Sequence, residues 1–176
     1  PSPASAAAAS ISSARARAVA ANTDPKRTFL RLLGAEHLPA SFAKDIGAFR
    51  QESASLRVNL ALSELPNFSA LPGGGEPGAH HRSSITLIES AQHLNEAFHS
   101  ARSGIPANPP IIEAIIPSSL DADLTDKPGH HVMSLLCKYM PYTLSEGQSW
   151  DDRKTAVVAQ ILDYLEGFIP DIRRIL

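Results

Sequence analysis

Residues 73–78 (GGGEPG) match the G-x-G-x-x-G pattern that binds the pyrophosphate of dinucleotides. The pattern works where a strand ends and a helix begins, because the helix N-terminus then presents backbone N–H groups to the pyrophosphate. Here no strand pattern precedes the glycines, Pro77 interrupts them and no helix pattern follows. We therefore interpret the stretch as part of a Gly- and Pro-rich loop over residues 66–82, and a loop of this length is usually mobile or functional.

Two pairs of adjacent histidines, His80-His81 and His130-His131, are the residues whose chemistry best suits a metal ion. Neighbouring side chains on a strand point to opposite faces, so each pair supplies at most one ligand to a common ion. No Cys, Asp or Glu completes a ligand set at a known spacing. We interpret these residues as ordinary loop histidines and predict no metal site.

Nucleophilic side chains are few. Ser118 and Ser119 have no evident base beside them in the sequence, so nucleophilic catalysis is not indicated. The single cysteine, Cys137, excludes a disulfide framework and a CxxC metal site. It lies within an apolar strand pattern, which predicts a small buried side chain.

The stretch that must position these groups is residues 129–144 (GHHVMSLLCKYMPYTL), which predicts the central strand of a sheet. Strand side chains alternate, so Met133, Leu135, Cys137 and Tyr139 point one way, and Val132, Leu136 and Met140 the other. A strand that is apolar on both faces is usually central. We expect Pro141 to end it, because proline has no N–H to donate.

The end of this strand carries the residues most suited to face a ligand. Aromatic and methionine side chains favour an apolar ligand, which makes Tyr139, Met140 and Tyr142 the substrate-facing candidates. The alternative is ordinary packing in the core and at its rim.

Other segments supply the rest of the fold. Alternating or apolar patterns predict strands at residues 17–21, 55–62, 84–88 and 111–116. The alternation over residues 55–62 predicts one buried face and one wetter face. Helix patterns begin at Asp24-Pro25, after Pro39, at Ser90 and at Ser149. The Ser90 helix places Leu94, Ala97, Phe98 and Ala101 on its apolar face. The fold class predicted is α+β, with a mostly antiparallel sheet of about four or five strands covered by helices.

Composition limits the class of protein. The chain has 176 residues, with 43% apolar and 19% charged residues, as in a soluble globular domain. A net charge of -2 gives no general attraction to nucleic acid. No apolar run approaches the roughly 20 residues that would span a bilayer. We predict a flexible Ala/Ser-rich tail at residues 1–16 and a single α+β domain at 17–176.

Residues 1–22 are rich in Ala and Ser, carry Arg15 and Arg17, and have no acidic residue. This composition is typical of a mitochondrial transit peptide, and a flexible tail is the alternative.

A family resemblance rests on residues 19–30 (VAANTDPKRTFL), 111–124 (IIEAIIPSSLDADL) and 129–144, followed by Trp150-Asp151. These stretches resemble the FAD-dependent amine-oxidoreductase-like family of the phytoene desaturase type. The resemblance covers nearly all of residues 17–170. It implies the fold of that family's substrate-binding domain, and it implies FAD as cofactor. This chain lacks the family's FAD-binding motif, so no FAD is expected on the chain alone.

The resemblance leaves two functions open. One is a substrate-binding-domain fragment of such an oxidoreductase, with Asn22 and Asp24 as cofactor-proximal candidates. The other is a non-catalytic structural or interaction subunit of a larger assembly, in mitochondria. Partners are then the missing FAD-binding domain or other protein chains, with contacts expected at residues 17–33. The chain alone is not expected to be catalytic. A mitochondrial, matrix-side location is implied, with a cytoplasmic one as the alternative.

Overall fold

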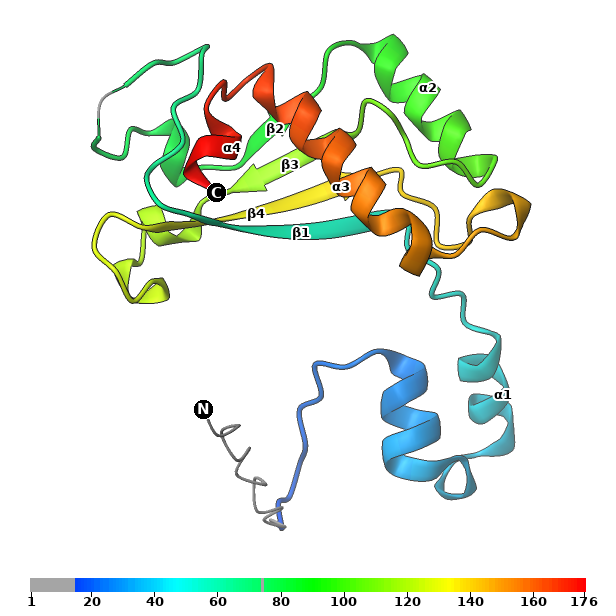
Figure 1. The fold of residues 1–176 in the computed structure, drawn as a ribbon. Helices are drawn as coiled ribbons and strands as arrows, with labels where there is room; N and C mark the ends of the chain where they lie inside the picture. Colours follow the sequence, from blue (N-terminus) through cyan, green and yellow to red (C-terminus); the bar gives the residue numbers. More distant parts are fainter. Residues whose placement is uncertain (1–14, 74) are drawn as a thin grey trace, which may run out of the picture. The chain divides into compact units, whose positions relative to one another are not determined.

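The computed structural model describes residues 15–73 and 75–176. The chain divides into two compact units, Pro1–Gln51 and Glu52–Leu176, and each is described by itself (Figure 1). The single domain expected over residues 17–176 stays a prediction. The predicted tail at residues 1–16 lies outside the described residues except for its last two.

The larger unit is built on a four-stranded antiparallel sheet, which confirms the predicted α+β fold class (Figure 1). The strands lie in the order β1-β4-β3-β2. Their bounds are β1 Ser55–Leu62, β2 Ile85–Leu87, β3 Ile111–Ile115 and β4 His131–Lys138. β4 is a central strand, as its apolar sequence predicts.

One face of β4 forms the middle of the core. Met133, Leu135 and Cys137 are all 0% exposed. The helix α3, Trp150–Glu166, lies over this face and supplies Val157, Ile161 and Leu165 to the same core cluster (Figure 1). Residues three and four apart on a helix share one face, so this stripe packs along the strand.

The other face of β4 is less covered than predicted. Val132, Leu136 and Lys138 are half-buried, and only Ser134 is buried. The strand also ends earlier than expected, at Lys138 and not at Pro141. Tyr139 takes a positive φ of 60°, which turns the chain out of the strand before the proline is reached.

The helix α2, Ala91–Arg102, begins at Ser90, whose Oγ accepts the His93 N–H at 3.0 Å. The predicted apolar face is wrong in part. Ala97 is buried as predicted, but Leu94 and Phe98 are exposed and His93 is buried in their place. Burial of a histidine is tolerated here because Nδ1 accepts the Glu89 N–H and Nε2 donates to the Pro109 carbonyl.

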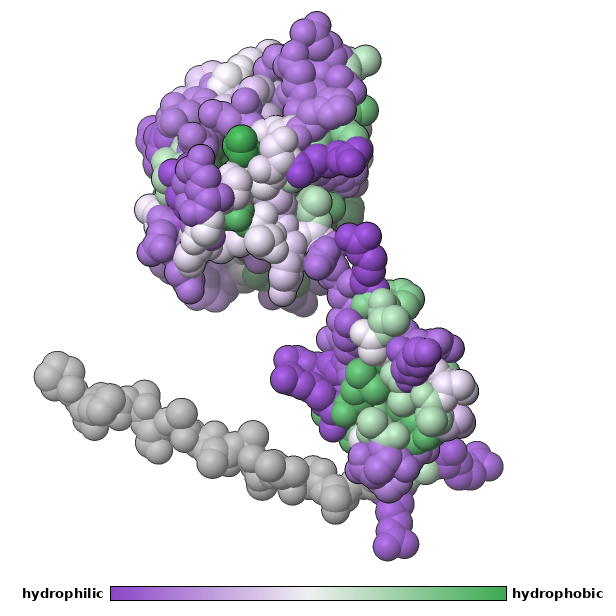
Figure 2. Space-filling model, turned by 90° about the vertical axis from the view of Figure 1, so that its right-hand side faces the viewer, coloured by the Kyte–Doolittle hydropathy of each residue, from purple (hydrophilic) through white to green (hydrophobic). Residues whose placement is uncertain are grey.

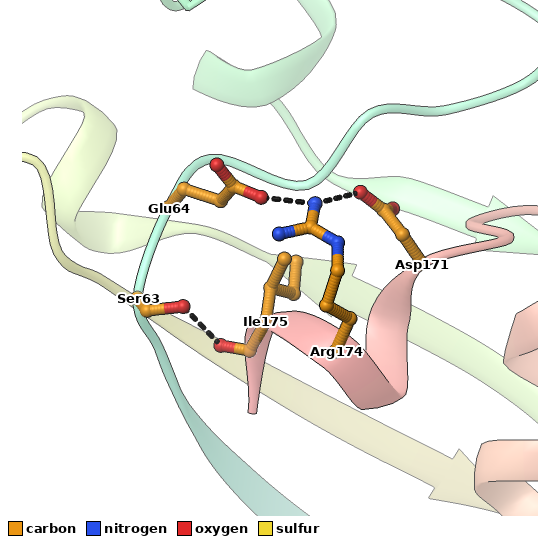
Figure 3. A network of polar contacts seen from close by, with 5 residues as sticks. All are labelled: Ser63, Glu64, Asp171, Arg174 and Ile175. Atoms are coloured by element: carbon orange, nitrogen blue, oxygen red, sulfur yellow. Dashed lines mark hydrogen bonds and ion pairs between the residues drawn. The ribbon is translucent and has the colours of Figure 1, made fainter.

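The chain returns to the sheet at its C-terminal end. The short helix α4, Ile172–Ile175, follows α3 and lies beside the end of β1 (Figure 3). The Ile175 carbonyl accepts hydrogen bonds from both the N–H and the Oγ of Ser63, at 2.7 and 3.0 Å. Arg174 forms ion pairs with Glu64 and Asp171. Because Ile172 and Ile175 are 0% exposed, this segment completes the core.

The smaller unit contains helices and no strand within its described residues. A helix with wide, π-type winding spans Arg27–Gly34, and α1 spans Ala40–Ala48. The strand predicted at residues 17–21 is wrong. A strand requires a neighbour to satisfy its N–H and C=O groups, and among the described residues none pairs with this segment.

Apolar side chains of the smaller unit remain largely on its surface (Figure 2). Neither helix has a buried residue, although the Phe29 and Phe42 rings meet edge to face at 5.1 Å. Leu32 is 69% exposed and Phe49 is 53% exposed. Several short 3-10 turns connect the elements of the chain, at Ala35–His37, His80–Arg82, Pro117–Ser119, Ala122–Leu124 and Ser145–Gly147.

Replacing Ser149 by Ala is expected to lower the free energy of unfolding by about 1 kcal/mol. The Ser149 Oγ accepts the Asp151 N–H at 3.0 Å, and that donor has no partner within the first turn of α3. A urea titration measures the change. Ser149→Asp is the matched control, because an aspartate also accepts at this position. Equal losses in both variants would show that the hydroxyl is not the cap.

Candidate functional site

The three substrate-facing candidates lie close in sequence but do not share one surface. Tyr139 is half-buried and packs against Ala97, Ala107 and Ile111. Its ring meets the Phe98 ring edge to face at 6.2 Å, and its carbonyl accepts the Ala107 N–H at 3.1 Å. Tyr139 therefore ties the end of β4 to α2.

Met140 and Tyr142 both line a hollow of about 460 Å³ beside the start of β1. Met140 is 2% exposed and belongs to the main core, whereas Tyr142 is 67% exposed at the rim. The other lining residues are Ser53, Ser55, Leu56, Pro141 and Trp150. That these tyrosines and this methionine face a substrate stays a prediction.

Trp150 is a lining residue that the sequence reasoning did not single out. Its indole Nε1–H donates to the Pro141 carbonyl at 2.9 Å, which fixes the turn after β4 to the first residue of α3. Trp150 is the one tryptophan of the chain, and this is the signal in the sequence that could have pointed to it.

Asp24, a cofactor-proximal candidate, lies in the smaller unit. Its Oδ1 accepts the Arg27 N–H and the Gln51 Nε2–H, both at 2.8 Å. The hydrogen bond from the Arg27 N–H is the main cause that lowers the pKa of Asp24, and the hydrogen bond from Gln51 lowers it further. The carboxylate also lines a shallow hollow of about 350 Å³ with Arg27 and Arg31. Asn22 is exposed and is not part of this lining. Their proximity to a cofactor stays a prediction.

The adjacent histidines occupy different environments. His81 is buried, with Nε2 donating to the Pro66 carbonyl at 2.8 Å and Nδ1 accepting the Gly78 N–H at 3.0 Å. Burial lowers the pKa of His81, and burial likewise lowers that of His131. Within residues 15–73 and 75–176, no three His, Cys, Asp or Glu side chains are grouped so as to hold a metal ion.

Ser118 does have a base beside it, which corrects the prediction from sequence. Its Oγ lies 3.1 Å from Nδ1 of His131, thirteen residues further along the chain. The Oγ also accepts the Val132 N–H at 2.9 Å, which leaves the hydroxyl hydrogen for the imidazole. Among the described residues no hydrogen bond or ion pair joins the His131 ring to a carboxylate, and Ser118 is 6% exposed. We interpret the pair as a structural hydrogen bond that joins the Pro117–Ser119 turn to β4.

Cys137 is expected to resist thiol reagents as long as the protein is folded. Burial raises the pKa of its thiol to about 12, and the thiolate is the reactive form. Labelling with a disulfide reagent at neutral pH should be slow in buffer and fast in concentrated urea. Fast labelling of the folded chain would show that the β4 core opens readily.

A polar row crosses the less-covered face of the sheet. Arg57 Nη1 donates to Ser134 Oγ at 2.7 Å, and Ser134 Oγ donates to Asn59 Oδ1 at 2.8 Å. Beside this row, Lys138 forms an ion pair with Glu113. The register places Arg57 opposite Leu136, so a guanidinium that bonds only to Ser134 among the described residues lies next to an apolar side chain. The alternating 55–62 pattern predicted a wetter face here, but not the hydrogen-bonded row.

The residues of the larger unit therefore define a two-layer α+β module, with a core on one side of its sheet and a structured polar face on the other. Comparison with known proteins relates this module to part of an oxidoreductase-like protein. The chain is 41% identical over 164 residues to pyridine nucleotide-disulfide oxidoreductase domain-containing protein 2 of Rattus norvegicus. It is 40% identical over the same length to the protein of that name from Mus musculus.

The match covers 91% of this chain but 28% of the length of these relatives. It confirms the predicted resemblance to a fragment of an oxidoreductase-like protein, and the phytoene desaturase type stays a prediction. No family model matches the chain. No solved structure matches it either. Among the described residues, no helix is both long and apolar enough to cross a membrane.

Proposed function

We propose that this chain is the substrate-binding part of an FAD-dependent oxidoreductase of the phytoene desaturase type. The relatives carry the words pyridine nucleotide-disulfide oxidoreductase in their names, and the chain matches 28% of their length. The observation that carries the proposal is the two-sided sheet. One face is used for the core, and the other presents an ordered polar row beside half-buried apolar side chains.

The residues described do not fit FAD. The glycine-rich stretch, of which Gly74 lies outside the description, leads into the three-residue turn His80–Arg82 and not into a helix. A pyrophosphate therefore finds no row of helix N-terminal N–H groups there. In the proposal, FAD is held by residues outside this chain, and the chain alone binds none.

In the proposal, the polar row binds a polar group of the substrate. Ser134 and Asn59 hold the Arg57 guanidinium in place, and its remaining donors are suited to a carboxylate, carbonyl or hydroxyl of a substrate. Leu136 and Val132 provide apolar surface for the apolar part of the same substrate. In flavoenzymes the flavin supplies the redox chemistry, and protein groups such as these orient the substrate.

The test uses the native protein that contains this chain. Arg57→Ala is expected to slow substrate-dependent flavin reduction and raise KM, with flavin content unchanged. Glu96→Ala, an exposed change on α2, is the matched control and should alter neither. A native protein without flavin, or equal kinetics in both variants, would contradict the proposal.

A non-catalytic interaction subunit is the second candidate, and the smaller unit favours it. Its helices bury no residue and leave Leu32 and Leu33 exposed, which is typical of a surface that another chain covers. Hydrogen exchange should then show stronger protection of amides 17–33 in the native assembly than in the isolated chain. Equal protection in both, with a monodisperse monomer, would remove the support for this candidate.

A mitochondrial, matrix-side location is part of the proposal. It is supported by the Ala/Ser-rich composition of residues 1–22, with arginines and no acidic residue. Fractionation of cells that express the native protein tests it. Recovery in the cytosolic fraction would favour the cytoplasmic alternative.

A further inference from the structure

An apolar hollow of about 370 Å³ lies at the edge of the sheet, away from the residues used above. Residues 68–71, strand β2, His80 and the two residues that follow α3 line it. The lining is mostly apolar, and its largest side chains are Phe68, Leu71, Ile85, Leu87 and Phe168. A concave apolar hollow of this size is typical of a small-molecule site.

The walls of the hollow are fixed by hydrogen bonds and by the core. The Ser69 N–H donates to the Phe168 carbonyl at 2.9 Å, which joins the loop to the end of α3. Phe68 and Leu87 are each 6% exposed and belong to the core cluster. These contacts fix the walls that Phe68, Ser69, Leu87 and Phe168 form, so only the His80 ring has to move when a ligand enters.

His80 provides one polar group in this apolar lining. Its Nε2 is closed to solvent and has no hydrogen-bond partner among the described residues. The ring is held between Phe68, edge to face at 5.9 Å, and His81, at 3.8 Å between centroids. His81 is in turn fixed by two hydrogen bonds: its Nε2 donates to the Pro66 carbonyl, and its own carbonyl accepts from Ser119 Oγ. A buried nitrogen without a protein partner is rare in folded proteins, so this ring nitrogen is the polar group of the lining that still has a hydrogen bond to make.

We propose that this hollow binds a small apolar molecule that carries one hydroxyl group. The apolar body contacts Phe68, Leu87 and Phe168, and the hydroxyl bonds to His80 Nε2. A hydroxyl both donates and accepts, so it suits this nitrogen in either tautomer of the ring. Because Nε2 is closed to solvent, the ring turns toward the ligand once the apolar body is seated.

The test compares 2-naphthol with naphthalene on the full 176-residue chain, by amide chemical shifts in two-dimensional NMR. Saturable shifts are expected at residues 69–71, 86–87 and 167–168 with both probes. 2-Naphthol should bind about three- to tenfold more tightly, the contribution of one hydrogen bond. Shifts scattered over the surface, or none at these residues, would overturn the site.

Two variants separate the parts of the proposal. His80→Phe keeps an aromatic ring and removes the nitrogen, so the two probes should then bind equally. Ala70→Trp fills the hollow from an exposed position and should abolish binding of both. His37→Phe, an exposed histidine of the smaller unit, is the matched control and should change nothing. An undiminished preference for 2-naphthol in His80→Phe would overturn the role of His80. Spectra that overlay outside the hollow confirm that each variant is folded.

Discussion

Replacing Leu135 by Ala is expected to lower the free energy of unfolding by about 2–5 kcal/mol. Leu135 is 0% exposed and lies in β4 between Val58 of β1 and Ala114 of β3. It belongs to the same core cluster as Ile161 and Leu165 of α3. Truncation removes apolar contacts and leaves a cavity that a strand bonded on both sides cannot close by moving. A urea titration followed by circular dichroism measures the loss.

Leu120→Ala is the control for this change. Leu120 is 71% exposed, so the same truncation should change the free energy of unfolding by less than about 0.5 kcal/mol. A loss below about 1 kcal/mol for Leu135→Ala would mean that the packing of α3 on the sheet is loose.

Gly104→Ala is expected to lower the free energy of unfolding by about 2–4 kcal/mol, from two separate causes. Gly104 ends α2 with a φ of +76°, which an L-residue adopts only with strain. An added Cβ would also lie 2.7 Å from the Ser145 backbone nitrogen, the same group whose N–H donates to the Gly104 carbonyl at 2.9 Å. The new methyl group therefore pushes apart two segments that a hydrogen bond joins.

Gly129→Ala separates the two causes. Gly129 has nearly the same φ, +79°, and an added Cβ there meets no atom within 4 Å. The expected loss is the strain alone, about 1–2 kcal/mol. The difference between the variants measures the close approach of residues 104 and 145, and equal losses would show that this approach relaxes without cost.

Local patterns in the sequence predicted most of the larger unit. Alternation over residues 55–62 matches β1 in both bounds and buried face, because a period of two is a property of the strand itself. Ser90 and Ser149 marked two helix starts correctly, since capping requires just the next turn of chain. The interpretation of residues 73–78 as a loop rests on the missing helix pattern after them, which is again a local property.

Tertiary structure decided what depends on partners distant in sequence. The strand expected at residues 17–21 does not form, because pairing requires a neighbour that local apolarity does not supply. His93 is buried in place of Leu94, because the Pro109 carbonyl lies within reach of its ring.

The side-chain contacts around the sheet depend on such long-range proximity even more. His131 reaches Ser118, and Arg57 reaches Ser134, only because the strand register brings residues 13 and 77 positions apart together. Sequence patterns alone predict the buried face of β4, the starts of the helices and the resemblance to an oxidoreductase fragment. Only the fold decided which side chains share a surface, since proximity across a sheet is set by register and not by any local pattern.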